Sequence, residues 1–343
     1  MKKVLFVATV VKTHIMQFHI PFLKMFKEMG WETAVAAKND YENPDDCVIP
    51  YCDIYYDIPF NRNPFGTKNI KSYKEIKGII DSNKYDIVHC HTPVGGMIAR
   101  LSARQARKNG TRVIYTAHGF HFYKGAPIKN WLLYYPAERF LARFTDTLIT
   151  INQEDYRIAQ KFNVPNVEYV HGVGIDITRF CADKSMRAEK RKELGIANDK
   201  FVLLTVGELI PRKNYELVLK AIAQMKNSEE YARILYLIVG RGVLHDKLVE
   251  LCIKLDISDK VKFLGYRSDI PDLCNISDCF IFMSKQEGLP VALMEAMACG
   301  LPAICSKIRG NTDLIKSNVN GYVTDFNTES ICASIKSFMS DID

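Results

Sequence analysis

Two acidic residues, Glu287 and Glu295, lie eight positions apart in a stretch that is typical of an anion-binding turn. Residues 284–306 open with polar side chains, Pro290 stands where a first helical residue is expected, and residues 300–302 (Gly-Leu-Pro) supply a helix stop. The N-terminus of such a helix offers free N–H groups and the positive end of a dipole, which suit a phosphate. Carboxylates beside the same turn suit hydroxyl groups. The pattern therefore favours a ligand that carries both, such as a nucleotide-sugar.

The elements around this pair predict a parallel sheet. A strand at 279–283, a short apolar helix at 291–299 and a buried strand at 303–305 form its strand–loop–helix–strand unit. A glutamate in a helix usually faces solvent, and one near a helix start is often only a dipole partner. Glu295, however, lies in an almost wholly apolar helix, where a lone buried carboxylate is costly unless it is paired. This favours a ligand-binding position for it.

The run Glu287-Gly288-Leu289-Pro290, followed by Glu295-Ala296-Met297-Ala298-x-Gly300-x-Pro302, resembles the E-x7-E signature of retaining glycosyltransferases of family 4. The resemblance covers nearly the whole chain and is greatest to the bacterial capsule and exopolysaccharide branch. It implies an α/β protein of GT-B architecture, in which two Rossmann-like domains have parallel sheets that face each other across a cleft. Residues 1–172 would form the acceptor-binding or membrane-facing domain, and residues 173–343 the nucleotide-sugar-binding domain.

Length and composition agree with two globular domains. A single core rarely grows past about 250–300 residues, and this chain has 343. The shares of hydrophobic (48%) and charged (25%) residues are ordinary, and no apolar run approaches the roughly 18 residues of a membrane span. The first residues fit a Rossmann strand better than a signal peptide. Ten scattered cysteines without a C-x-x-C motif indicate reduced cytosolic thiols rather than disulfides or a metal site.

The net charge of +7 lies entirely in the first half, where residues 1–175 hold 23 Lys and Arg against 16 Asp and Glu. Such an excess attracts nucleic acid, a phosphorylated acceptor or an anionic membrane surface, although simple solubility would also explain it. Residues 123–144 mix Lys124, Lys129, Arg139 and Arg143 with large aromatics, so this segment either rests on lipid headgroups or packs into the core. The basic run 100–112 is either a solvated helix face or a contact for membrane or acceptor.

Histidines follow two predicted strands of the first half. The strand at 86–90 ends in His89-Cys90-His91, which suggests metal, but no nearby residue completes a ligand set, so we expect a strand end at the cleft rim. The strand at 112–116 leads to His118 and His121; the resemblance places His118 close to the donor sugar and leaves His121 structural. Upstream, a strand at 4–11 precedes a predicted helix at 14–30 with Phe18, Phe22, Met25 and Phe26 on its core face. The turn between them lacks the G-x-G-x-x-G motif, which argues against a classical dinucleotide-binding site there.

The second half supplies the remaining donor-binding candidates. The strand at 201–206 leads into Gly207-Glu208-Leu209-Ile210-Pro211-Arg212-Lys213, where the family has G-R…K-G and two cations that neutralise the donor pyrophosphate. Lys213 matches the lysine, Glu208 replaces the arginine, and Arg212 could supply the missing charge. Gly240 follows the strand at 234–239 and suits close backbone approach. Arg267 follows the strand at 261–264, near which the family reads the base.

The resemblance implies transfer of a hexose or N-acetylhexosamine from a nucleotide-sugar, with UDP favoured, to a hydroxyl of a polyprenyl-diphosphate-linked saccharide, with anomeric configuration retained. His118, Lys213 and Glu287 would be catalytic. The donor would be held by Gly207, Arg212, Lys213, Gly240, Arg267, Glu287, Gly288, Leu289, Pro290, Val291 and Glu295. No cofactor or nucleic acid is implied. The only D-x-D, residues 341–343, is terminal, so we expect metal-independent chemistry. The enzyme would lie at the inner face of the cell membrane.

Two other functions fit the same residues. A nucleotide-sugar epimerase of the same fold would release a free sugar epimer and need no acceptor. A nucleotide-binding regulatory subunit could keep the fold without turnover, and Glu208 in place of arginine is the feature that favours it.

Overall fold

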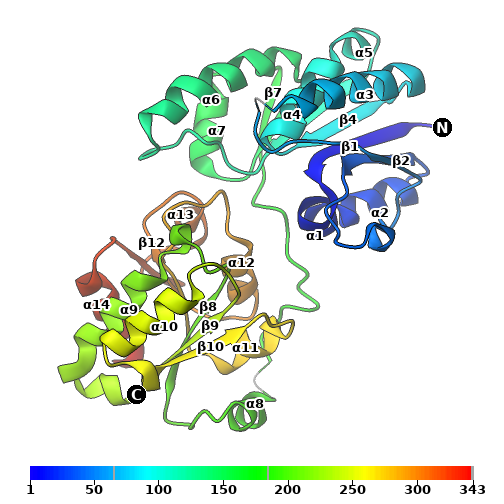
Figure 1. Cartoon of the computed structure of the whole chain (residues 1–343). Coiled ribbons are helices and arrows are strands. Elements are labelled where there is room, and N and C mark those ends of the chain that lie inside the picture. Colours follow the sequence, from blue (N-terminus) through cyan, green and yellow to red (C-terminus); the bar gives the residue numbers. More distant parts are fainter. Residues whose placement is uncertain (65, 184, 341–343) are drawn as a thin grey trace. The chain divides into compact units, whose positions relative to one another are not determined.

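The structure is a computed structural model that describes residues 1–64, 66–183 and 185–340 (Figure 1). The terminal Asp-Ile-Asp motif lies outside these residues. The chain divides into two compact units, Met1–Val173 (unit 1) and Gly174–Asp343 (unit 2), one residue from the predicted division. Each is an α/β unit built on one parallel sheet, as expected.

Unit 1 has seven parallel strands in the order β3-β2-β1-β4-β5-β6-β7. Their bounds are β1 (Lys3–Val10), β2 (Glu32–Lys38), β3 (Ile54–Asp57), β4 (Ile87–His91), β5 (Arg112–Ala117), β6 (Thr147–Thr150) and β7 (Asn166–Tyr169). The order reverses between β1 and β4. In open parallel sheets, ligands bind outside the carboxyl ends of the strands at such a reversal.

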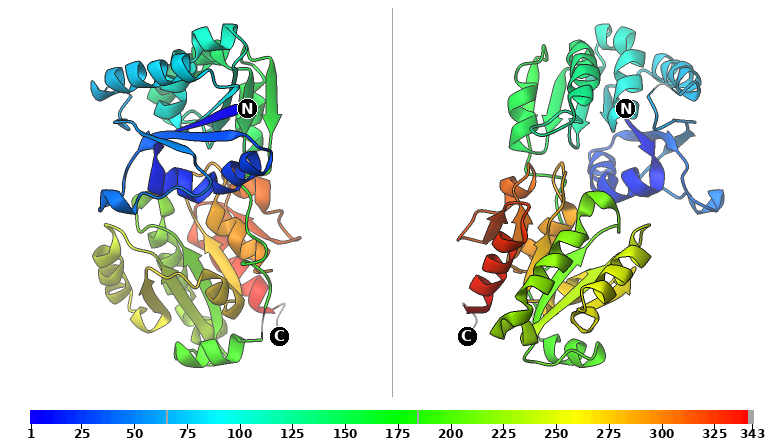
Figure 2. Two further views of the ribbon diagram at one scale, coloured as in Figure 1. Left: turned by 90° about the vertical axis from the view of Figure 1, so that its right-hand side faces the viewer. Right: turned by 60° about the vertical axis from the view of Figure 1, so that its left-hand side comes forward.

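Helices cover both faces of this sheet (Figures 1 and 2). Side chains alternate along β1, because successive residues of a strand point to opposite faces. Leu5 and Val7 pack with one core cluster and Phe6 with the other. The helices are α1 (Met16–Phe18), α2 (Ile20–Glu28), α3 (Lys68–Asn83), α4 (Pro93–Ser102), α5 (Arg104–Lys108), α6 (Ile128–Leu141) and α7 (Gln153–Ala159).

The predicted helix at 14–30 was wrong in its start and in part of its buried face, although Phe26 packs against the core as predicted. β1 runs into one wide π-helical turn, Val11–Ile15, and a break separates α1 from α2. Phe22 and Met25 are 39% and 42% exposed. His14 and His19 are buried instead, because the π turn changes which side chains face the sheet.

Unit 2 has six parallel strands in the order β10-β9-β8-β11-β12-β13, which reverses between β8 and β11. The strands are β8 (Phe201–Val206), β9 (Ile234–Val239), β10 (Val261–Gly265), β11 (Cys279–Phe282), β12 (Ala303–Ser306) and β13 (Gly321–Thr324). The helices are α8 (Arg187–Glu193), α9 (Tyr215–Gln224), α10 (His245–Lys254), α11 (Ile270–Ile276), α12 (Val291–Ala298), α13 (Asn311–Leu314) and α14 (Thr328–Ser340). Leu219 of α9 and Leu293 of α12 belong to separate core clusters on the two sides of the sheet.

The basic run at 100–112 is not one solvated helix face. Arg100 is 1% exposed, forms an ion pair with Glu138 of α6 at 2.9 Å, and lies 3.9 Å from the ring centre of Tyr115. Arg107 pairs with Asp146 at 2.8 Å. These residues connect helices to the sheet, so they are not free to bind a partner.

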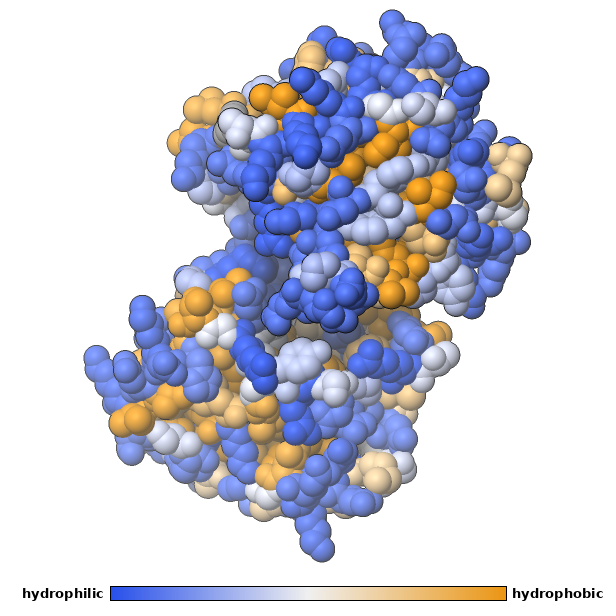
Figure 3. All heavy atoms as spheres, turned by 45° about the vertical axis from the view of Figure 1, so that its right-hand side comes forward, coloured by the Kyte–Doolittle hydropathy of each residue, from blue (hydrophilic) through white to orange (hydrophobic). Residues whose placement is uncertain are grey.

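The surface in Figure 3 is mostly hydrophilic with separate apolar patches, as the composition leads one to expect. None of the helices in the described ranges is long and apolar enough to cross a membrane. All ten cysteines are free thiols, as predicted.

Candidate active site

The reversal in the strand order of unit 2 brings together two loops that are far apart in sequence. The loop after β8 carries Arg212 and Lys213, and the loop after β11 carries Ser284 and Glu287. Because β8 and β11 are neighbours and parallel, both loops leave the same edge of the sheet. The strand order therefore makes neighbours of side chains more than 70 residues apart.

One carboxylate oxygen forms the centre of this group. Glu287 Oε1 accepts hydrogen bonds from Lys213 Nζ at 2.8 Å and Ser284 Oγ at 2.6 Å, and Arg212 Nη1 lies 2.9 Å away. Glu287 is 9% exposed. Two cations thus share one buried carboxylate, a few residues before the start of α12.

Burial and charge act on Lys213 in opposite directions. Desolvation lowers the pKa of Lys213, and the negative charge of Glu287 opposes this. The Nζ atom also lies 4.5 Å from the ring centre of Phe282. Arg212, which donates to the backbone carbonyl of Gln286 at 2.8 Å, is in the group, whereas Glu208 is exposed.

The loop that carries Glu287 is held by buried polar contacts. Ser306 Oγ donates to the carbonyl of Ser284 at 2.5 Å, and Asn311 Nδ2 donates to the carbonyl of Ser306 at 3.1 Å. Arg309, 7% exposed, donates from Nε to the carbonyl of Glu287 at 3.1 Å. Residues at the end of β12 and after it therefore hold this loop in place.

Glycines allow the strand ends to approach closely. Gly240 has φ +142°, and a Cβ atom there would lie 1.9 Å from the carbonyl oxygen of Gly207. Gly310 has φ +79°, and its Cβ would lie 2.5 Å from the carbonyl oxygen of Gly288. Glycine tolerates both conformations because it lacks that atom.

Two predicted donor contacts lie apart from this group. Glu295 is one turn into α12, where burial raises its pKa and the charge of Arg179 opposes the rise. Arg267 follows β10 and forms a paired interaction with Asp269, which raises the pKa of Arg267. In the part of the chain that the structure describes, neither residue forms a hydrogen bond or ion pair with Glu287.

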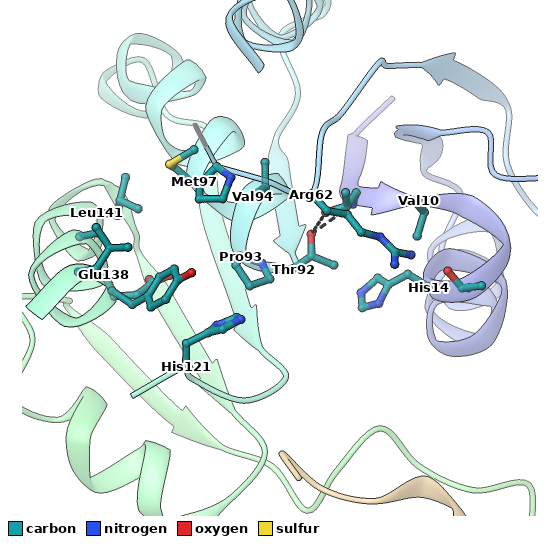
Figure 4. A pocket seen from close by; sticks show the side chains of 16 residues that line it. Val10, His14, Arg62, Thr92, Pro93, Val94, Met97, His121, Glu138 and Leu141 are labelled. Atoms are coloured by element: carbon teal, nitrogen blue, oxygen red, sulfur yellow. Dashed lines mark hydrogen bonds between the residues drawn. The ribbon is translucent and has the colours of Figure 1, made fainter. Parts of the chain in front are cut away.

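Unit 1 contains a cavity of about 640 Å³ between the start of α4 and α6 (Figure 4). Its wall is apolar at Met97 and Leu141, and polar groups project from Arg62, His14 and Glu138. Thr9 and Thr92 are hydrogen-bonded to each other at 2.6 Å on the same lining. Such a cavity suits a molecule with both hydroxyl and apolar parts.

Four histidines converge at the strand reversal of unit 1: His14, His19, His91 and His118, here called the histidine cluster. One ring nitrogen from each lies within 4.8 Å of the others. The expectation that nothing completes a ligand set around His91 was therefore wrong. Its partners come from the turn after β1 and from the end of β5, neither of which is near it in sequence.

Burial keeps these imidazoles neutral. Desolvation lowers the pKa of His14 to about 3 and that of His118 to about 4, and it also holds the pKa of His19 and His91 well below the ordinary value. His89, on the same strand, has a partner in Thr116 Oγ1 at 2.9 Å, and its pKa falls to about 3 through burial.

Sequence reasoning missed Arg309, His14 and His19. Arg309 stands between a strand end and a helix start marked by Gly310, a position that points toward the carboxyl edge of the sheet. The two histidines, five residues apart after the first strand, fell within the predicted helix at 14–30 and were given no role. No signal in one sequence reveals the π turn that buries them.

Comparisons with known proteins agree with this architecture. A family model described as glycosyl transferases group 1 matches residues 186–342, and one described as glycosyl transferase 4-like matches residues 3–152. The chain is 42% identical over 325 residues to the glycosyltransferase named EpsD of Bacillus subtilis (strain 168), covering 94% of this chain and 83% of that protein. It is 32% identical over 269 residues to an Escherichia coli enzyme, UDP-Gal:alpha-D-GlcNAc-diphosphoundecaprenol alpha-1,3-galactosyltransferase, covering 78% and 69% of the two chains.

Among solved structures, Anabaena HepE in complex with UDP and glucose matches with a TM-score of 0.79 at 22% identity, over 100% of this chain and 91% of that one. This likeness confirms the GT-B fold. The two family models and the EpsD match together show that the chain belongs to the group 1, family 4-like glycosyltransferases.

Proposed function

We propose that this glycosyltransferase moves a hexose or N-acetylhexosamine from a UDP-sugar to a hydroxyl of a polyprenyl-diphosphate-linked saccharide, with retention, during exopolysaccharide or capsule synthesis. The observation that carries the proposal is the convergence of Lys213, Arg212 and Glu287 at the strand reversal of unit 2. The E. coli relative, whose name specifies a UDP-sugar and a diphosphoundecaprenol acceptor, supports the choice of substrates.

The donor chemistry is stabilisation of growing negative charge. As the bond from the sugar to the phosphate breaks, the sugar becomes oxocarbenium-like and the diphosphate gains charge. Lys213 and Arg212 are already oriented by Glu287, so they need little reorganisation to meet that charge. The backbone N–H groups of Gly288, Leu289 and Val291, around the start of α12, would add donors to the same anion.

Arg212 takes the place of the missing family arginine in this proposal. It shares the carboxylate of Glu287 with Lys213, whereas Glu208 is exposed. This weakens the argument for a subunit without turnover, which rested on Glu208. Glu287 has a second role, because its carboxylate would also accept from hexose hydroxyls and fix the sugar's pose.

Glu295 and Arg267 complete the proposed donor contacts. Glu295 would accept from or donate to the ribose hydroxyls, and its raised pKa suits a polar contact that is shielded from water. Gly207 and Gly240 would let the backbone approach the diphosphate, and Arg267 would lie by the base. His118 remains the proposed contact of unit 1 with the donor sugar.

The cavity in unit 1 is the proposed acceptor site. Its threonines and His121 offer hydrogen-bond partners for a sugar, and Arg62 offers a cation for a diphosphate. Leu133 and Met97 provide an apolar wall for the ring faces or the first lipid carbons. This mixture fits a lipid-linked saccharide better than a free sugar phosphate.

Helix α6 is the proposed contact with the membrane. Ile128 is 78% exposed, Leu132 74% and Phe140 50%, and Lys129 and Arg139 accompany them on the same helix. Trp131 and Tyr135, in contrast, pack against the core of unit 1. Exposed apolar residues among cations are typical of a helix that lies on anionic headgroups.

Product analysis tests the proposal. The protein is incubated with UDP- and GDP-sugars, with and without a polyprenyl-diphosphate-linked saccharide, and nucleotide and sugar products are measured. We expect UDP release that requires the acceptor. A free epimer without acceptor would establish the epimerase, and tight nucleotide binding without product would establish the regulatory subunit.

Variants then test the roles of the residues. Lys213→Ala should mainly lower kcat, and Glu295→Ala should mainly weaken donor binding. Glu250→Gln, which changes an exposed carboxylate on α10, is the matched control and should leave both unchanged. Wild-type kinetics from both Lys213→Ala and Glu295→Ala would refute the assignment.

A further inference from the structure

The histidine cluster contains buried ring nitrogens for which the described residues offer no hydrogen-bond partner. These are His14 Nε2, both ring nitrogens of His19, and His91 Nε2. The three side chains are 8%, 2% and 1% exposed. A buried polar nitrogen without a partner lowers stability, and here several of them gather in one place. Such a group requires an explanation beyond packing.

The cluster is built from three neighbouring strand ends. β1, β4 and β5 are adjacent and parallel, so the residues that follow them meet at one edge of the sheet. The π turn after β1 brings His14 inward, and the helix break at His19 brings in the second ring, with the two ring centres 5.0 Å apart. Single π turns are frequent at functional sites.

The rings already approach a common point. His118 Nε2 lies 3.4 Å from His91 Nδ1, and the ring centres of His19 and His91 are 3.8 Å apart. In a tetrahedral zinc site, with Zn–N bonds of about 2.0–2.1 Å, neighbouring ligand nitrogens lie roughly 3.4 Å apart. Because the ring nitrogens of the cluster lie within 4.8 Å of one another, small side-chain rotations would bring them to the distances of a zinc site.

We propose that His14, His19, His91 and His118 form a binding site for a divalent transition-metal ion of the zinc class. Neutral imidazole is the ligand that zinc, copper and nickel accept and that magnesium does not favour. His14 also lines the unit 1 cavity, which provides an entry path for the ion.

This site is distinct from the group of Lys213, Arg212 and Glu287, but it includes His118, the proposed contact of unit 1 with the donor sugar. The donor group in unit 2 uses lysine and arginine against phosphate, and the metal would lie in unit 1. Coordination through His118 Nε2 would leave Nδ1 protonated, because a metal on one nitrogen fixes the ring's tautomer. The metal would then hold His118 as a hydrogen-bond donor, without forming any bond to the sugar itself.

Metal binding to the intact protein tests this proposal. Metal-free protein, prepared with a chelator and then desalted, is titrated with Zn²⁺ by calorimetry and with Co²⁺ by visible absorption, with Mg²⁺ as the negative control. We expect one ion per chain, the intense visible bands of a tetrahedral Co²⁺ site, displacement of Co²⁺ by Zn²⁺, and no response to Mg²⁺. Zn²⁺ should also raise the melting temperature of the unit 1 transition.

Two single substitutions and one control identify the ligands. His19→Gln and His118→Gln should each weaken Zn²⁺ binding by roughly 10-fold or more. His245→Gln changes an exposed histidine in unit 2 and should leave affinity unchanged. Circular dichroism checks that each variant is folded.

The wild-type titration decides the question even if a variant does not fold. Absence of saturable binding, or a Co²⁺ spectrum typical of six oxygen ligands, would overturn the proposal and leave the cluster as packed neutral rings. Binding that survives in both folded cluster variants would do the same. Because none of these measurements uses a donor or acceptor, they stay independent of whether the proposed transfer reaction occurs.

Discussion

Replacing Glu287 by glutamine tests whether this carboxylate organises the cations of the proposed donor site. The substitution keeps the shape of the side chain and one acceptor oxygen but removes the charge. Lys213, whose side chain is 12% exposed, would then be a nearly buried cation without its anionic partner. Arg212, at 41% exposed, can turn to water instead.

The expected loss of stability follows from these exposures. A hydrogen bond to a charged group contributes about 1.5–3 kcal/mol, which applies to the buried Lys213 contact. The more exposed Arg212 contact contributes roughly 0.5 kcal/mol. The sum is about 3 kcal/mol, and in a unit of this size it lowers Tm by roughly 6–12 °C. Donor turnover should fall as well, because both cations lose their orientation.

Differential scanning calorimetry on the full chain measures the first effect at the unit 2 transition. Glu250→Gln, which changes an exposed carboxylate on α10, is the control and should shift Tm by little. The double variant Glu287→Gln/Lys213→Met removes the unpaired charge and should recover about 2 kcal/mol of the loss. The reasoning is refuted if Glu287→Gln melts with the wild type, or if the double variant shows only the sum of the single losses.

Three further outcomes are expected. The histidines of the cluster have pKa values far below 6.5 in the folded chain and near 6.5 in the unfolded chain, so the unfolded chain binds more protons below pH 6.5. Unit 1 should therefore lose stability as the pH falls from 6.5 toward about 4, by up to about 1.4 kcal/mol per histidine per pH unit. A constant Tm over that range would contradict this. Gly240→Ala should lower the free energy of unfolding in urea by at least about 2 kcal/mol and weaken UDP binding, because of the positive φ and the close backbone contact. Gly78→Ala, at a helical position with open space around it, should be neutral or stabilising. Equal stability of the two variants would contradict the tight turn at Gly240. Leu132→Glu should reduce sedimentation of the protein with phosphatidylglycerol vesicles severalfold relative to Ile253→Glu, which changes a similarly exposed residue in unit 2. Identical vesicle binding by the two variants would contradict a membrane contact through α6.

The sequence predicted the regular parts of both units because local patterns encode them. Apolar β-branched runs identified strands such as β1 and β8, and proline and glycine marked the ends of α12. The alternation of strands with helices indicated parallel sheets. Lys213 and Glu287 could be named because the signature and the loop composition carry them.

The parts that escaped prediction depend on contacts between distant segments. Arg100 was placed on a polar helix face because its neighbours in sequence are basic, yet Glu138, 38 residues away, neutralises it in the core. His91 could not be connected with His14 and His19 until the strand order was known. Aromatic residues near position 22 suggested a buried face that the π turn rotates toward solvent.

The ion pair between Arg100 and Glu138 has a consequence for how unit 1 would respond to a lipid surface. It fastens α6 to α4 beneath the side chains that would touch headgroups, and Glu138 also lines the cavity. Separating Arg100 from Glu138 would leave a buried charge without its partner, so we expect α6 and the cavity wall to move together. Membrane binding through α6 would therefore change the shape of the cavity, and a molecule that enters the cavity would change the position of α6.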